Sequence, residues 1–276
     1  MSLRIGVIGV GEMGRPLVDR LVAAGHSVAA YVRRPELKAE LAAMGVEIAP
    51  SVEALARGRE FVILYVYTDD QVKDLALEGG LVEAMDAGAS LIIHTTGSPL
   101  TAEAIAARAE PRGVRVVDAA GSGGPAKVAA GEVTMLVGGA AEDFERCRAV
   151  LDVYADPVLH VGPLGAGQRF KLINNVMFGA HIQLALEACR VAREFGIDAG
   201  EMARAFATCS GDSAAMRIIS AIGSPEALVK GAGRFVYKDV TVAAKLAAEL
   251  GADLGLLSTV TEPLMAMLEP TQSAHG

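Results

Sequence analysis

The sequence LRIGVIGVGEMG, from Leu3 to Gly14, decides the fold. Residues 3–9 form an apolar run typical of a buried strand, and a helical pattern follows it. The spacing Gly-x-Gly-x-x-Gly between strand and helix is the pattern of a dinucleotide-binding turn. Gly9 would make the tight turn, Gly11 would let the backbone approach a pyrophosphate, and Gly14 would let the helix pack closely on the strand. The phosphates would then sit at the helix N-terminus, where N–H groups favour an anion.

Apolar runs alternate with helical patterns over the following hundred or so residues. This alternation predicts an α/β fold with a parallel, doubly wound sheet of the Rossmann type. A further strand over residues 131–139 follows with little helix before it, so we expect it to join the sheet antiparallel. The other strands are expected at 27–32, 61–66, 91–94, 114–119 and 157–161.

A change of character after Pro163 predicts a second, all-α domain. Residues 166–194 carry apolar groups around the whole circumference of one helix, which indicates burial on all sides. At 1.5 Å per residue this helix spans roughly 43 Å, more than one small domain can cover. We therefore predict a Rossmann domain over 1–163 and a helical substrate and dimerisation domain over 164–276, joined by a long interdomain helix. A homodimer or homotetramer is expected to cover that helix.

The remaining helical pattern, from residue 199 to 268, is interrupted by glycine. Breaks between helices are expected at Gly211, at 223–225 and at 231–233. The polar tail 269–276 is expected to fray.

Composition and charge exclude several classes of function. The chain has 25 basic and 33 acidic side chains, a formal net charge of −8, so it lacks the basic footprint of a nucleic-acid-binding protein. We expect no membrane partner, because no run is basic enough for a membrane surface or apolar enough to span a bilayer. The three cysteines are far apart, which predicts neither a disulfide framework nor a zinc site and favours a reducing cytoplasm. No metal site is expected.

The end of the second strand bears on the choice of cofactor. A site that prefers NAD usually places an acid there for the ribose 2′-hydroxyl, whereas this chain has Arg33 and Arg34. Guanidinium groups suit a 2′-phosphate, so NADP is expected, with NAD as the alternative. An ordinary solvated strand end would also account for the two arginines. Because ligands of such sheets lie beyond the carboxyl ends of the strands, Val66, Tyr67 and Thr96 are expected beside the cofactor.

Two further groups suggest chemistry. Lys171 and Asn175 are four residues apart near the start of the long helix, so they share one face. They could equally be a lysine extending its charge to solvent and a satisfied core amide. The segment Ser122-Gly123-Gly124 follows a buried strand and is either a flexible turn or a nest of N–H donors and a hydroxyl that holds a carboxylate.

In combination these motifs resemble the β-hydroxyacid dehydrogenases, the family of 3-hydroxyisobutyrate dehydrogenase, tartronate semialdehyde reductase and the glyoxylate/succinic semialdehyde reductases. The resemblance covers almost the whole chain. Its four motifs, in order, are the turn Gly9 to Gly14 with Met13 in place, the substrate loop Asp118 to Gly124, the motif Gly165-x-Gly-x-x-x-Lys171-x-x-Asn174-Asn175, and the pair Lys238-Asp239.

Four departures from the family pattern bear on the substrate. Ala120-Gly121 replaces the usual Pro-Val of the substrate loop, Ile93 stands where an acid is usual, and Val66-Tyr67 replaces a common Leu-Pro. The segment 234–237 that leads to Lys238 is also short. The resemblance leaves fold and cofactor class intact and the substrate open.

The resemblance implies an oxidoreductase that transfers a hydride between NADP(H) and a small β-hydroxyacid or aldehyde-acid. Lys171 takes the position of the catalytic lysine, and Asn175 is expected to hold the reacting oxygen or orient the ammonium. Burial and the charge of Lys238 are expected to lower the pKa of Lys171, so that it can act as general acid and base. An imine reductase and a catalytically silent NADP-binding protein are the alternatives.

The predicted site residues fall into three groups. The catalytic residues are Lys171 and Asn175, and the substrate would be bound by Ser122, Gly123, Gly124 and Lys238. The cofactor residues are Gly9, Val10, Gly11, Glu12, Met13, Gly14, Arg33, Arg34, Val66, Tyr67, Thr96 and Lys238.

Overall fold

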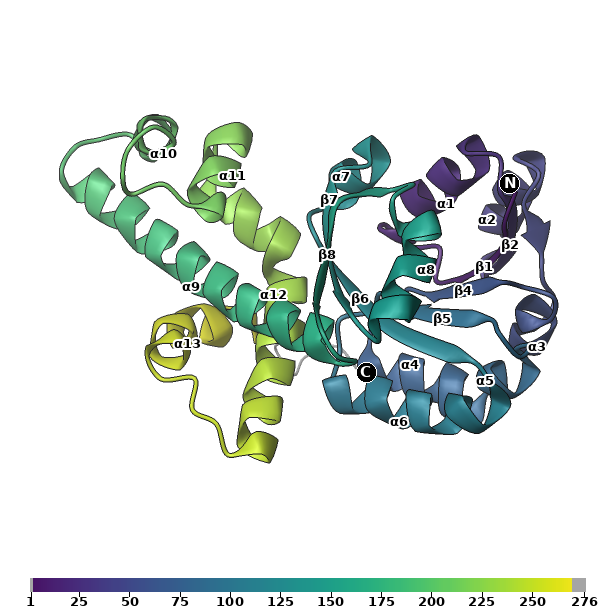
Figure 1. Ribbon diagram of the computed structural model, residues 1–276. Coiled ribbons are helices and arrows are strands. Elements are labelled where there is room, and N and C mark those ends of the chain that lie inside the picture. The colour runs from purple at the N-terminus through teal and green to yellow at the C-terminus, as the bar shows by residue number, and fades with distance from the viewer. Residues whose placement is uncertain (1, 270–276) are drawn as a thin grey trace, which may run out of the picture. The chain divides into compact units, whose positions relative to one another are not determined.

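The computed structural model describes residues 2–269 and divides into two compact units, Met1–Lys171 and Leu172–Gly276. The first is an α/β unit and the second is helical (Figure 1). The division falls within one long helix, so the domain boundary predicted after residue 163 stays a prediction. Most of the tail expected to fray lies outside the described residues.

An eight-stranded sheet organises the first unit. Its strand order is β3-β2-β1-β4-β5-β6-β7-β8, and every neighbouring pair is parallel except β6 with β7. The doubly wound sheet and the antiparallel addition are thus confirmed. The strands are β1 (Arg4–Ile8), β2 (Ser27–Tyr31), β3 (Glu47–Ile48), β4 (Phe61–Leu64), β5 (Ser90–Ile93), β6 (Arg115–Ser122), β7 (Val133–Gly138) and β8 (Ala155–Gly162).

Helices cover both faces of this sheet, which explains why its central strands are continuously apolar. One face packs against α1, α2 and α8, and the other against α3, α5 and α6. A short helix, α7, follows the predicted substrate loop, in a segment where the sequence predicted little helix. The helical segments of this unit are α1 (Gly14–Ala23), α2 (Pro35–Ala43), α3 (Val52–Ala56), α4 (Asp69–Lys73), η1 (Asp74–Glu78), α5 (Leu81–Ala84), α6 (Pro99–Ala109), η2 (Glu110–Arg112), α7 (Pro125–Ala130) and α8 (Ala141–Leu151).

The second unit packs its helices around a core of its own. One face of α9 is buried in that core by residues such as Val176 and Cys189. Another face leaves Ile173, Met177 and Leu184 exposed in the single chain. The burial of this helix on all sides was predicted together with a partner subunit and stays a prediction. The helices are α9 (Ala166–Glu194), which begins in the first unit, α10 (Ala199–Phe206), α11 (Ala214–Ile222), α12 (Pro225–Leu250) and α13 (Leu256–Leu268).

The helix breaks were predicted correctly at two of three places. The segment around Gly211 and the segment 223–224 separate helices, but α12 runs through residues 231–233 without interruption. A side chain at Gly233 would overlap Leu268 of α13. Gly233 therefore allows α12 and α13 to pack closely. This packing keeps a glycine within a helix, although it costs about 1 kcal/mol there relative to alanine.

Within residues 2–269, no helix is both long enough and apolar enough to cross a bilayer. The three cysteines are free thiols; Cys147 and Cys189 are buried and Cys209 is exposed.

Candidate active site

The glycine turn between β1 and α1 has the geometry that the fingerprint predicts. Gly9 has a φ of 99°, and a Cβ there would overlap the carbonyl of Tyr65. A Cβ at Gly14 would overlap the carbonyl of Gly9, whereas one at Gly11 would have no atom of the chain within 4 Å. Two glycines thus let the backbone pack closely, and the third leaves open space where a pyrophosphate can approach.

A cleft of about 470 Å³ opens beside this turn at the carboxyl edge of the sheet. Arg33 and Arg34 line it together with the glycine turn, and Arg34 donates a hydrogen bond to the carbonyl of Val10 (3.3 Å). Both arginines therefore line the same cleft as the glycine turn. Asp74 also lines the cleft and was not anticipated from the sequence.

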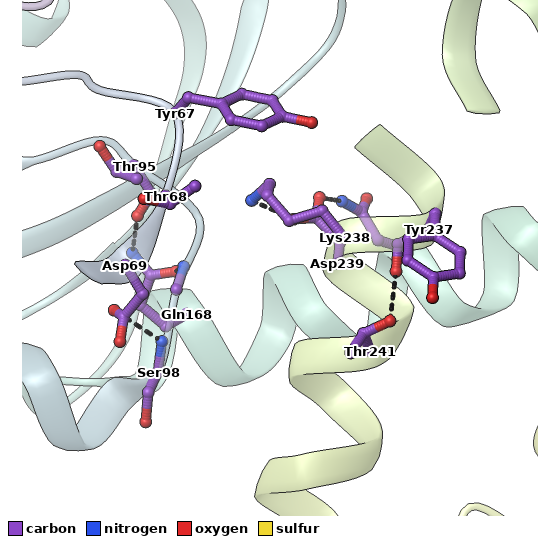
Figure 2. A network of polar contacts seen from close by, with 12 residues as sticks. Tyr67, Thr68, Asp69, Thr95, Ser98, Gln168, Tyr237, Lys238, Asp239 and Thr241 are labelled. Carbon is purple, nitrogen blue, oxygen red and sulfur yellow. Dashed lines mark hydrogen bonds and ion pairs between the residues drawn. The ribbon is translucent and has the colours of Figure 1, made fainter. Parts of the chain in front are cut away.

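Hydrogen bonds brace the loops that follow β4 and β5. The hydroxyl of Thr95 accepts from the N–H of Val66 (2.8 Å) and donates to its carbonyl (3.0 Å). Asp69 accepts from the N–H of Ser98 (3.1 Å) (Figure 2). It also accepts from the hydroxyl of Thr101 (2.7 Å). These hydrogen bonds fix the two loops at the edge of the sheet. The loops contain the predicted cofactor residues Val66, Tyr67 and Thr96.

The predicted substrate loop begins as sheet. Ser122 is the last residue of β6 and pairs with Thr134 of β7, so the sheet fixes its backbone. Gly123 has a φ of 143°, which only glycine adopts readily, and Gly123 and Gly124 are exposed. The hydroxyl and two N–H groups thus occupy neighbouring positions at the carboxyl end of a strand, where they can receive a carboxylate.

The start of α9 is attached to the same edge of the sheet. Asp118 of β6 accepts from the N–H groups of Gly165 (2.5 Å) and Gln168 (2.7 Å). The side chain of Gln168 donates to the carbonyl of Thr95 (2.9 Å) and accepts from the N–H of Gly97 (3.0 Å). Lys171 follows one turn later, and only 9% of it is exposed. The lysine is therefore a buried basic group about one turn after residues that are bonded to β6 and to the loop after β5.

Asn175 lies one turn beyond Lys171 on α9, and its surroundings belong to the second unit. Its amide donates to the carboxylate of Asp239, which also forms an ion pair with Lys238 (2.5 Å) (Figure 2). Asp239 of α12 thus holds an amide and an ammonium group that the sequence reading assigned to the site.

His94 forms part of the core of the first unit. It is buried, its Nδ1 bonds the carbonyl of Ala119 (2.5 Å) and its Nε2 bonds the hydroxyl of Tyr154 (2.8 Å). Because a carbonyl only accepts, Nδ1 carries the proton and Nε2 accepts from the tyrosine. Burial lowers the pKa of His94 to about 4, so the ring is neutral near pH 7.

Three residues whose side chains bond parts of the site, Asp118, Gln168 and Asp239, were not predicted as site residues, and neither was Asp74, which lines the cleft. A signal existed for Asp118, because an acid within the apolar strand Val116–Ala120 is buried and needs partners. Its partners lie some 50 residues away in the sequence, and no local pattern identifies them.

Two family models match the chain in succession. Residues 4–162 match the NAD-binding domain of 6-phosphogluconate dehydrogenase. Residues 165–275 match the NAD-binding domain of NADP-dependent 3-hydroxyisobutyrate dehydrogenase.

Individual dehydrogenases are similar to this chain in sequence and in structure. The chain is 37% identical to L-threonate dehydrogenase of Cupriavidus necator over 72% of this chain and 67% of that one. It is 32% identical to 3-hydroxyisobutyrate dehydrogenase of Pseudomonas aeruginosa over 78% of this chain and 72% of that one. A solved structure of Mycobacterium tuberculosis 3-hydroxyisobutyrate dehydrogenase with L-serine superposes with a TM-score of 0.84 at 26% identity, covering 97% of this chain and 94% of that one.

Fold, glycine turn and cleft define an NAD(P)-dependent dehydrogenase with a nicotinamide cofactor and a small-molecule substrate. The chain belongs to the β-hydroxyacid dehydrogenase family, whose reaction is hydride transfer on a β-hydroxyacid.

Proposed function

We propose that this chain is an NADP(H)-dependent β-hydroxyacid dehydrogenase or aldehyde-acid reductase in which Lys171 moves the proton. The observation that carries the proposal is the buried lysine on a turn bonded beside Thr95 and to β6, the strand that ends at Ser122. A buried ammonium group needs a purpose, because removal of a cation from water is costly.

The substrate's carboxylate is bound at the end of β6. The hydroxyl of Ser122 and the N–H groups of Gly123 and Gly124 donate to its two oxygens, which orients the carbon that bears the reacting oxygen.

NADPH, when bound, supplies the hydride that reduces this carbon. Lys171 donates a proton from its ammonium group to the carbonyl oxygen as the carbon is reduced, so that an alcohol forms and the lysine becomes neutral. In the oxidative direction the neutral amine accepts the hydroxyl proton. Asn175 is proposed to bond the same oxygen, and Lys238 to contribute to the binding of substrate and cofactor.

Preference for NADP is supported by Arg33 and Arg34 in the cleft. Asp74 lines the same cleft, and its carboxylate would favour a ribose hydroxyl over a phosphate. Asp74 is therefore the side chain that would favour NAD. Two guanidinium groups against one carboxylate leave a net positive charge among these three side chains, which favours the 2′-phosphate.

A homodimer or a homotetramer is proposed as the assembly. Ile173, Met177 and Leu184 are exposed and recur at spacings of four and seven, which places them on one stripe of α9. Exposed large apolar side chains in such a row are typical of a subunit interface.

A spectrophotometric screen at 340 nm tests the function. The panel is 3-hydroxyisobutyrate, L-serine and L-threonate with NADP⁺ or NAD⁺, and glyoxylate, succinic semialdehyde and tartronate semialdehyde with NADPH or NADH. Turnover of at least one substrate of this panel with NADP⁺ or NADPH is expected. A cyclic imine with NADPH is assayed beside the panel. Turnover of that imine alone would favour an imine reductase, and cofactor binding without any turnover would favour a silent binding protein.

A further inference from the structure

The proposed mechanism leaves one buried carboxylate in the first unit without a role. Asp118 is fully buried in β6, and both of its oxygens accept hydrogen bonds from the backbone at the start of α9. The first N–H groups of a helix have no partner within the helix. The carboxylate therefore caps α9 from a strand that lies far away in the sequence.

Glycines make this contact close. A Cβ at Gly138 would overlap the carboxylate of Asp118, and a Cβ at Gly167 would lie 2.7 Å from its Oδ2. Burial raises the pKa of Asp118, and its two backbone hydrogen bonds oppose the rise. The geometry excludes water and leaves the helix start as the carboxylate's bonding partner.

The same turn has a second attachment. Gln168 is 1% exposed, and its amide bonds both the carbonyl of Thr95 and the N–H of Gly97. A single turn of α9 is thus bonded through Asp118 to β6 and through Gln168 to the loop that contains Thr96.

We propose that Asp118 and Gln168 are positioning residues for Lys171: together they fix the start of α9, and with it the lysine, relative to β6 and to the loop that follows β5. This inference rests on the proposed role of Lys171. Gln168 and Lys171 are three residues apart, so they are neighbours on one helix face. A reacting group displaced by about 1 Å can cost roughly a hundredfold in rate, which is why a fixed turn matters.

The substitution Asp118→Asn tests this with little change of volume. The amide keeps one acceptor oxygen, but its NH₂ group faces an N–H donor, so one hydrogen bond is lost and the turn is released at that point. The experiment is a double-mutant cycle of Asp118→Asn with Lys171→Ala. It measures kcat with the panel substrate of highest kcat/KM, and the Kd of NADPH by fluorescence.

If Asp118 acts through the lysine, Asp118→Asn lowers kcat about tenfold in the wild type and less than twofold in Lys171→Ala, while the Kd of NADPH changes less than twofold. Equal losses in both backgrounds, or no loss in the wild type, would overturn the inference. A Lys171→Ala protein with normal turnover would instead overturn the proposed function, so the two failures are distinguishable.

Two further variants guard against a trivial result. Asp143→Asn removes another acid of the same unit, one that lies on α8 and pairs with Arg115 at the start of β6, and should leave kcat unchanged in both backgrounds. If Asp118→Asn does not fold, Gln168→Met replaces it in the cycle, because methionine keeps the length of the side chain and removes both of its hydrogen bonds. The same non-additivity is expected, and additive losses contradict the inference.

Discussion

Arg33 and Arg34 determine the choice of cofactor in this account. Arg33→Ala combined with Arg34→Ala should weaken NADPH binding by about 1–3 kcal/mol, the scale of lost charge-assisted hydrogen bonds, and should leave NADH binding nearly unchanged. Fluorescence titration with both cofactors measures this. Asp74→Asn is the matched variant in the same cleft, and it should strengthen NADPH binding or leave it unchanged. Equal affinity of the wild type for the two cofactors would contradict the assignment.

His94 should make folding sensitive to mild acid. Its pKa is about 4 in the folded chain because burial disfavours the imidazolium, against about 6.5 when unfolded. Between these pH values the unfolded chain binds a proton that the folded chain does not. The folded state therefore loses stability as pH falls from 6.5 to 4, by up to about 3 kcal/mol.

Urea unfolding at pH 7, 5.5 and 4.5 measures this loss, with His94→Gln as the comparison. The variant should be less stable at pH 7 but should lose less on acidification than the wild type. If the free energy of unfolding of the two proteins fell equally with pH, protonation of His94 would not be the cause of the loss.

Substitution of two glycines in the turn between β1 and α1 should change different properties: the stability of the fold for Gly14 and cofactor binding for Gly11. Gly14→Ala places a Cβ against the carbonyl of Gly9 and should lower the free energy of unfolding by about 1–3 kcal/mol. Gly11→Ala meets no atom of the chain within 4 Å and should change stability by less than about 0.5 kcal/mol. Its methyl group would nonetheless occupy space expected for the pyrophosphate, so NADPH binding should weaken at least tenfold. Thermal unfolding and cofactor titration of both variants check this, and a Gly11→Ala protein with normal affinity would contradict the location of the phosphates.

Secondary-structure elements with a local sequence signal could be predicted from the sequence alone. The alternation of apolar strands and helices predicted the sheet and its antiparallel strand β7, because both signals are local. The continuity of α12 through residues 231–233 was not predictable, because it depends on packing against Leu268 in another helix. The hydrogen bonds of Asp118 with Gly165 and of Asp239 with Asn175 were missed for the same reason: these partners are 47 and 64 residues apart in the sequence.

For the whole molecule, the exposed stripe on α9 predicts self-association. Leu184→Asp should convert a dimer or tetramer into a monomer, because a buried charge without a partner opposes assembly. Leu100→Asp is the control: it is another exposed leucine, and it lies in the first turn of α6, where an acid is favourable. Light scattering at micromolar concentration distinguishes the species. A wild-type monomer at that concentration would contradict the proposed assembly.

The central claim is that Lys171 moves the proton during hydride transfer. The most direct test compares steady-state turnover of Lys171→Ala with that of the wild type on the best substrate of the screen, together with the Kd of NADPH for each. The account predicts a fall in kcat of at least ~10²-fold, the low end for general acid–base catalysis, with NADPH affinity nearly unchanged. Near-normal turnover of Lys171→Ala would show that the proton comes from another group and would contradict the account.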